Sequence, residues 1–159
     1  MDVQTRRRTL RLLTNGLYVL TSRDQDHYGA ATITWLSQAS FKPPLLMAAV
    51  RPDSNTFQCL ARSGVAAVHV LGVDQQDIAL KFFAPTRVRD GQINGEPFTE
   101  GVSGAPILTR LSAWVECRVV QIVSTGGDHA TVILEVLEAQ YRAPVEPLTI
   151  AASPWEYGG

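Results

Sequence analysis

The chain has 159 residues, and its 14 basic and 15 acidic side chains give a formal net charge of −1 at pH 7. This length suits one domain, which we expect to cover residues 1–159 and to bury its core without disulfides or a structural metal. A near-neutral chain with no run of about 20 apolar residues argues against nucleic-acid partners and against a membrane span.

The cysteines and histidines show no metal-ligand spacing. Cys59 and Cys117 lie far apart, without a Cys-x-x-Cys pair, so we expect ordinary buried thiols and a reducing cytoplasm as the location. His27 lies in a polar loop and His69 in an apolar run, where a hydrogen-bonded core or interface histidine is expected. His129 follows Gly-Gly-Asp at a hairpin end, and no metal site is expected.

The chain begins with a predicted helix and hairpin. Residues 2–14 have helical spacing, with Val3, Leu10 and Leu13 expected to face inward. Residues 17–22 are predicted to form a strand, which a polar loop over residues 23–29 joins to the next one.

Residues 30–44 (AATITWLSQASFKPP) combine a strand pattern with many small and hydroxyl side chains. We predict one strand that ends near Ser40, because Pro43 and Pro44 have no N–H for a central ladder. Neither face of this strand is cleanly apolar, which is typical of a ligand site that a flat molecule approaches closely. Trp35 is equally suited to pack on a ligand or to fill the core.

Short elements follow up to the middle of the chain. We predict a strand over residues 45–50, a helix capped by Asp53 or Ser54 and closed by Ser63-Gly64, and a strand over residues 65–71. A helix is predicted over residues 74–83, with Asp74 as its N-cap.

The second half of the chain is less regular. Residues 85–106 hold four glycines and are predicted to be a long excursion with one turn at Asp90-Gly91, either functional or surface filler. Residues 112–124 and 129–140 form a predicted hairpin, and the tail over residues 141–159 has no period. Mainly antiparallel strands with a few short helices favour a closed or partly closed barrel, and no Gly-x-Gly-x-x-Gly supports a Rossmann site.

Several segments, in this order, resemble the flavin reductase-like family of FMN-binding split β-barrels. They are GAATITWLSQASFKPPLLMAAVRPDSNT, SGVAAVHVL, QDIALKFF, GAPILTRLSAWVECRVV and GGDHATVILEVLEA. The resemblance runs from about Asn15 to Ala139 and implies a mainly β (α+β) antiparallel split β-barrel. It also implies FMN, with FAD as an alternative, as cofactor, and NADH or NADPH as co-substrate.

The resemblance assigns site residues along the chain. The flavin ring is expected along the hydroxyl-rich strand, at Thr32, Thr34, Trp35, Ser37, Gln38 and Ser40. The phosphate is expected at the helix N-terminus that Ser54, Asn55 and Thr56 form, with Arg51 just before it. The basic and aromatic pair Lys81-Phe82, on the next helix, is also expected there. Spacing alone favours a simpler interpretation, in which Ser54 only caps the helix and Arg51 and Lys81 are solvated. Asp53 must point away from any phosphate. The resemblance places His129 beside the nicotinamide, whereas the pattern alone makes it a turn residue, and no catalytic side chain is assigned.

The resemblance implies an NAD(P)H-dependent flavin reductase. An FMN-bound electron-transfer protein without nicotinamide oxidation and a small binding module are the alternatives. A homodimer and an electron-accepting partner such as a flavin-dependent oxygenase are also implied. Many relatives end in an aromatic and arginine-rich strand near the cofactor, a role that Trp155 and Tyr157 are candidates to fill in this tail.

Overall fold

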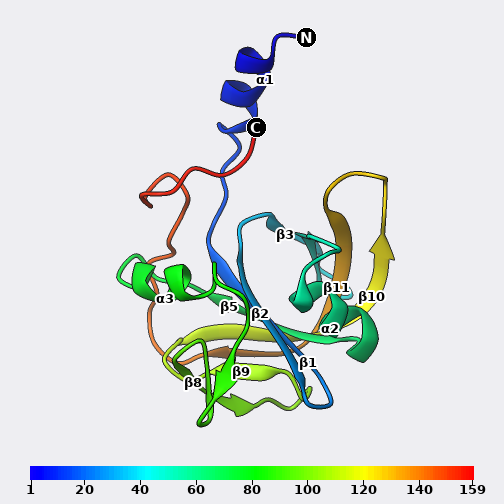
Figure 1. Ribbon diagram of the computed structural model, residues 1–159, viewed down its shortest axis with the longest axis vertical. Helices are drawn as coiled ribbons and strands as arrows, with labels where there is room; N and C mark the ends of the chain where they lie inside the picture. Colours follow the sequence, from blue (N-terminus) through cyan, green and yellow to red (C-terminus); the bar gives the residue numbers. More distant parts are fainter.

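The computed structural model describes all residues, 1–159, and is mainly antiparallel sheet with three short helices, which confirms the predicted fold class (Figure 1). The helices are α1 (Val3–Leu10), α2 (Asn55–Ser63) and α3 (Gln76–Lys81). The strands of the large sheet are β1 (Tyr18–Asp24), β2 (His27–Ile33), β3 (Leu36–Ser40), β4 (Leu45–Val50), β5 (Val65–Val70), β10 (Ala113–Val123) and β11 (Ala130–Tyr141). The small sheet contains β6 (Val88–Arg89), β7 (Gln92–Ile93), β8 (Glu96–Glu100) and β9 (Pro106–Leu108).

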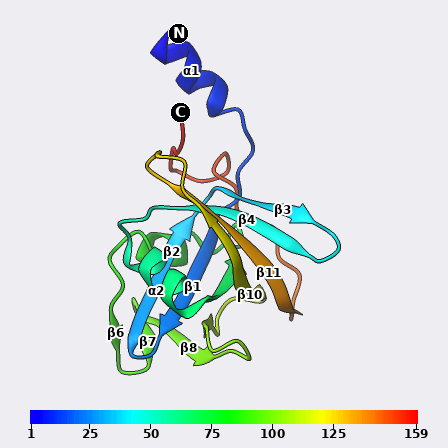
Figure 2. The ribbon, with the colours of Figure 1, turned by 90° about the vertical axis from the view of Figure 1, so that its right-hand side faces the viewer.

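The large sheet has the order β2-β1-β5-β10-β11-β4-β3, and every pairing in it is antiparallel. Its two end strands, β2 and β3, are consecutive in the chain, so the sheet must curl until its ends meet. Apolar side chains from β1, β2, β4, β5, β10, β11 and α2 fill the space inside this curl. The result is a barrel whose closing segment is the short connection between β2 and β3 (Figure 2).

That connection corrects the prediction of one strand from Ala30 to Ser40. The strand breaks at Thr34 and Trp35, since β2 ends at Ile33 and β3 begins at Leu36. Alternation along one strand cannot reveal a break that arises because the chain passes from one end of the sheet to the other.

Helix α2 lies against β1 and β2, and its local signals were predicted correctly. The Ser54 side chain accepts a hydrogen bond from Phe57 N–H, and Gly64 ends the helix in the left-handed conformation with φ 72°. The start of the helix packs closely on β2 at Gly29, where an added Cβ would lie 2.5 Å from Thr56 Cα. Glycine at this position therefore allows the helix N-terminus to touch the strand.

Helix α3 and the segment after it differ from the prediction. Helix α3 begins two residues later than expected, and Asp74 does not cap it. Residues 85–106 are not an irregular excursion, because β6, β7 and β8 pair in series and β8 also pairs with β9. The turn at Asp90-Gly91 is present, with φ of 52° and 74°. Strands β6 and β7 were missed because each has only two residues, too few to show an alternating pattern in the sequence. Pairing with the neighbouring strands defines them instead.

Helix α1 projects away from the barrel and lies close to the C-terminus (Figure 1). It buries none of its residues, and Val3, Leu10 and Leu13 are exposed, so the prediction that they face inward was wrong. The tail joins the body through Leu148, which is 1% exposed and whose N–H and C=O bond to Leu71 and Leu17.

The buried thiols and the core histidine were predicted correctly. Cys59 and Cys117 are free and buried. His69 Nδ1 lies 3.1 Å from the Val19 carbonyl oxygen and Nε2 accepts the Leu108 N–H at 3.1 Å, so the neutral ring is fully paired. Burial lowers the pKa of His69 from 6.5 to about 4. The longest helix has nine residues, and none is suited to span a membrane.

Candidate functional site

Three chain segments meet at one end of the barrel. The end of β4 pairs with the start of β11, with Val50 opposite Ala130. The Ala49 N–H donates to the Trp35 carbonyl oxygen at 2.9 Å, which ties the β2–β3 connection to the same place. The residues just beyond these pairs, Arg51 and His129, are therefore brought beside Trp35.

A cavity of about 220 Å³ opens between these segments, and we call it the inner cavity. Its wall is mostly apolar, with a few polar side chains, which is the usual composition of a small-molecule site. Its lining residues are Ala31, Thr32, Ile33, Thr34, Trp35, Ala49, Val50, Arg51, Ser54, Phe83, His129 and Tyr157.

Two threonines of this wall differ in their hydrogen bonding. The Thr32 hydroxyl donates to the Ala79 carbonyl oxygen at 2.8 Å, and this bond ties β2 to α3. Thr34 lines the inner cavity, and its hydroxyl is buried and has no partner in the chain. An unpaired buried hydroxyl costs free energy, so Thr34 fits a ligand that offers a polar edge at this point.

A second cavity of about 380 Å³, the outer cavity, continues the inner one. The two share Ala31, Ser54 and Phe83, and together we call them the groove. The outer cavity is lined by Ala30, Ala31, Ser54, Asn55, Thr56, Phe82, Phe83, Ala84, Pro85 and Thr86. The groove thus runs from the barrel end to the N-terminus of α2.

The N-terminus of α2 has the features of an anion site. The first N–H groups of a helix, here those of Asn55 and Thr56, have no acceptor within the helix and carry the positive end of its dipole. The Ser54 hydroxyl is already engaged, since it accepts from Phe57 N–H at 3.1 Å and donates to the Arg51 carbonyl oxygen at 2.7 Å. The Asn55 amide donates to the Tyr28 carbonyl oxygen and holds the helix end on β2.

Arg51 and Asp53 pair with each other at the rim. Arg51 Nε and Nη2 lie 3.1 and 2.9 Å from the two carboxylate oxygens of Asp53. This pairing lowers the pKa of Asp53. The expected repulsion between Asp53 and a phosphate is thereby reduced, because the carboxylate is occupied by a cation.

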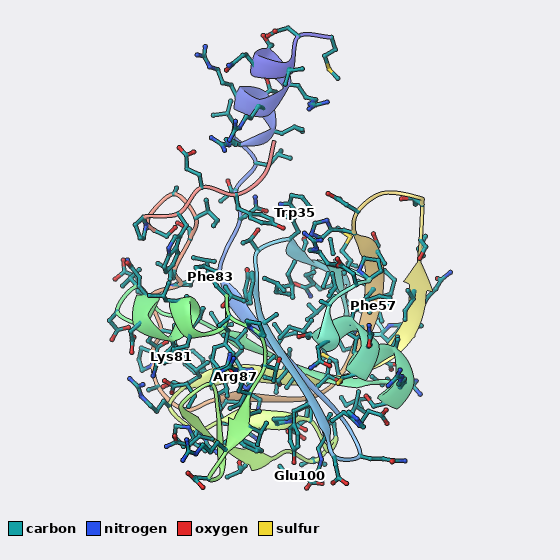
Figure 3. All side chains as sticks on the ribbon, in the orientation of Figure 1. Trp35, Phe57, Lys81, Phe83, Arg87 and Glu100 are labelled. Atoms are coloured by element: carbon teal, nitrogen blue, oxygen red, sulfur yellow. The ribbon has the colours of Figure 1, made fainter.

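An aromatic cluster of Trp35, His129 and Tyr157 closes one side of the inner cavity (Figure 3 labels Trp35). The ring centroid of Trp35 lies 4.7 Å from that of His129 and 5.2 Å from that of Tyr157. His129 Nδ1 lies 2.8 Å from Asp128 Oδ1, and Nε2 lies 3.2 Å from the Tyr157 hydroxyl. Contact with His129 lowers the pKa of Asp128, and burial raises that of Tyr157. In the neutral ring Nδ1–H donates to Asp128 and Nε2 accepts from Tyr157.

The groove contains only part of the predicted site. It contains Thr32, Thr34, Trp35, Arg51, Ser54, Asn55, Thr56, Phe82 and His129. Ser37 and Gln38 are exposed on β3, and neither they nor Ser40 line the groove, because the chain turns away after Trp35. Lys81 also lies outside it, with its Nζ 2.6 Å from Glu96 Oε1.

One aromatic residue of the groove, Phe83, was not assigned from sequence, and Tyr157 was named only as a candidate in the tail. Phe83 lines both cavities and packs edge-on against Trp155 at 4.9 Å. Tyr157 lies in the tail, which has no sequence period. Its aromatic side chain was the one feature that could indicate a role at the site.

Comparison with known proteins gives one family. The sequence model of the family described as "Flavin reductase like domain" matches residues 10–153. The chain is 26% identical over 117 residues to FMN reductase (NADH) RutF of Pseudomonas syringae pv. syringae, which covers 74% of this chain and 65% of that one. It is 27% identical to HsaB of Rhodococcus jostii, named as the reductase subunit of a flavin-dependent monooxygenase, over 98% of this chain and 84% of HsaB.

Solved structures agree with the fold. The structure of SgcE6 of Streptomyces globisporus C-1027, named as an NADH:FAD oxidoreductase, superposes with a TM-score of 0.80 at 25% identity. That match covers 99% of this chain and 92% of SgcE6. Against three of the curated relatives, however, the chain spans only 32% to 65% of their length.

Proposed function

Since the chain belongs to the flavin reductase-like domain family, we propose that it binds a flavin in the groove and reduces it with NADH or NADPH. The observation that carries the proposal is the groove itself: Thr34, whose hydroxyl has no partner, lines the inner cavity, and Asn55 and Thr56 at the start of α2 line the outer one. A flavin mononucleotide has a polar-edged ring at one end and a phosphate at the other, so these two sets of residues suit it.

Each part of the groove then has a role. Thr34 hydrogen-bonds the edge of the flavin ring, while Ala31 and Ala49 keep the wall flat enough for the ring to approach the backbone. The N–H groups of Asn55 and Thr56 hold the phosphate, as helix N-termini commonly do. Ser54 contributes chiefly as the cap that fixes this helix end.

His129 and Tyr157 border the nicotinamide. Bound flavin supplies the redox chemistry, in which it takes a hydride from the reduced nicotinamide, and the protein supplies orientation. The Asp128 carboxylate and the Tyr157 hydroxyl hold the His129 ring from both of its nitrogens. A ring fixed in this way presents a defined surface to the nicotinamide nucleotide without acting as an acid or base.

Two measurements test the function. Titration of the flavin-free protein with FMN is expected to change flavin fluorescence and to release heat, and no signal at high micromolar FMN would end the proposal. Anaerobic addition of NADH or NADPH is then expected to bleach the bound flavin. Protein that holds FMN yet never bleaches with either nicotinamide would be an electron-transfer protein instead.

We propose a homodimer, because α1 buries no residue and because Val3 and Leu10, with Leu13 just after the helix, are exposed for a second copy to cover. Light scattering that returned 17.3 kDa across the micromolar range would overturn this proposal.

We also propose that the reduced flavin passes to a flavin-dependent oxygenase, as the name of HsaB suggests for that protein. Multiple turnovers with free flavin in excess would support release of the reduced flavin, and a single turnover would count against it. The two free thiols, Cys59 and Cys117, support a location in the reducing cytoplasm. Fractionation that returned the protein outside the cytoplasm would contradict that location.

A further inference from the structure

The groove does not end at the N-terminus of α2. Ala84 and Pro85 line the outer cavity and also a neighbouring pocket of about 440 Å³, whose other lining residues are Lys81, Arg87 and Asn94. We call it the basic pocket. A ligand that extends beyond a phosphate at α2, past Ala84 and Pro85, enters the basic pocket.

Two cations give the basic pocket its charge. The Arg87 side chain is exposed and takes part in no hydrogen bond or ion pair within the chain. The Lys81 ammonium donates one hydrogen bond to Glu96 Oε1 at 2.6 Å, which leaves two of its N–H groups for a ligand. The single negative charge of Glu96 is shared between two cations, because Arg110 Nη1 also lies 2.8 Å from the same carboxylate oxygen. The charge of Lys81 is therefore only partly neutralised.

The walls of the basic pocket are held in place by one side chain. Asn94 Nδ2 donates to the Lys81 carbonyl oxygen at 2.9 Å, and Asn94 Oδ1 accepts the Arg87 N–H at 2.7 Å. Asn94 has a φ of 49° and belongs to the turn between β7 and β8. Both cations are therefore anchored at their backbones, beside the apolar edge that Ala84 and Pro85 form. Figure 3 shows Lys81 and Arg87 on the side of the molecule that also carries Phe83.

We propose that the basic pocket binds the adenosine monophosphate half of FAD, so that this protein prefers FAD to FMN. The inference rests on the proposed function, since it requires the flavin ring and first phosphate to lie in the groove. The second phosphate of FAD then contacts Arg87 and Lys81, which FMN does not reach. The adenosine lies along Ala84 and Pro85.

Titrations of the flavin-free protein with FMN and FAD, without nicotinamide, test the inference. In low salt FAD is expected to bind about tenfold more tightly than FMN, the size of one charge-assisted contact. Arg87→Ala should bring the two dissociation constants to within about twofold and leave that of FMN nearly unchanged. Raising the salt to about 0.5 M should reduce the preference, because exposed charges are screened.

Arg89→Ala is the matched control. Arg89 lies two residues away, is equally exposed, pairs only with Asp90 and does not line the basic pocket. It is expected to keep the full preference for FAD. A loss of preference as large as that of Arg87→Ala would overturn the inference, because it would show an effect of overall charge.

Further outcomes separate this inference from the function beneath it. Wild-type protein that binds FMN and FAD equally would overturn the inference and leave the function standing. Failure to bind either flavin would overturn both. If Arg87→Ala instead raised the KM for NADH or NADPH with an unchanged FAD-to-FMN ratio, the basic pocket would serve the nicotinamide dinucleotide, and the inference would be wrong.

Discussion

Replacing Thr34 by valine should stabilise the flavin-free protein and weaken flavin binding at the same time. Valine has nearly the shape of threonine, so the substitution mainly removes a buried hydroxyl that has no partner in the chain. An unsatisfied buried hydroxyl costs about 1 to 3 kcal/mol, which sets the expected gain in the free energy of unfolding. For a chain of this size, about 1 kcal/mol raises the Tm by roughly 2–4 °C.

The same hydroxyl is expected to pair with the flavin ring, so its loss should weaken binding. A hydrogen bond of this kind contributes about 0.5 to 1.5 kcal/mol net, which corresponds to a roughly two- to tenfold increase in the Kd for flavin. Denaturant unfolding without flavin measures the first effect, and fluorescence titration measures the second. Saturating flavin should reduce the stability gain, because the ligand stabilises the wild-type protein more.

Thr32→Val is the matched control for this prediction. Thr32 lines the same cavity, but its hydroxyl already donates to the Ala79 carbonyl oxygen at 2.8 Å. Its replacement should lower stability, because a buried acceptor loses its donor, whereas Thr34→Val should raise it. A Thr34→Val protein that was less stable than wild type, or that bound flavin equally well, would refute the role assigned to Thr34.

Three further predictions address other parts of the molecule. Tyr157→Phe keeps the ring and removes the 3.2 Å hydrogen bond to His129. It should raise the KM for the nicotinamide about two- to tenfold and leave the Kd for FMN nearly unchanged. An equal change in KM and Kd would assign Tyr157 to the flavin. Stability should fall by about 3 kcal/mol between pH 6.5 and pH 4 from His69 alone, because the unfolded chain takes up a proton near 6.5 and the folded chain only near 4; a His69→Gln variant that kept this whole pH dependence would contradict the assignment. Gly29→Ala should destabilise the protein and weaken FMN more than riboflavin, since the new Cβ would lie 2.5 Å from Thr56 Cα and displace the phosphate-binding helix end; equal losses for both ligands in titration would argue against that helix end as the phosphate site.

The elements predicted well are those whose signals are local. Helix α2 has a serine cap and a left-handed glycine within its own segment, and the β10–β11 hairpin has two long apolar patterns on either side of a glycine-rich turn. Helix α1 shows the limit of this reasoning. Its apolar spacing indicates a face suited to burial. Spacing does not say whether anything in the same chain covers that face.

The candidate site was predicted in the parts that follow one segment and missed where distant segments meet. The start of α2 has the local chemistry expected of a phosphate site, so Asn55 and Thr56 could be proposed from sequence, and both line the outer cavity. Tyr157 lies in the groove only because the tail returns past Phe83, where Trp155 packs at 4.9 Å. No period or motif in the tail reports that return.

The position of the site follows from the way the barrel closes. The β2–β3 connection must pass from one end of the sheet to the other, and it does so across the point where β4 ends and β11 begins. Thr34 lies in that connection, and its buried hydroxyl has no partner in the chain. The register that sets Val50 opposite Ala130 also sets Arg51 beside His129. Closure of the barrel and assembly of the groove are therefore the same structural event, and a register shift between β4 and β11 would separate Thr34 from His129 even if every strand remained intact.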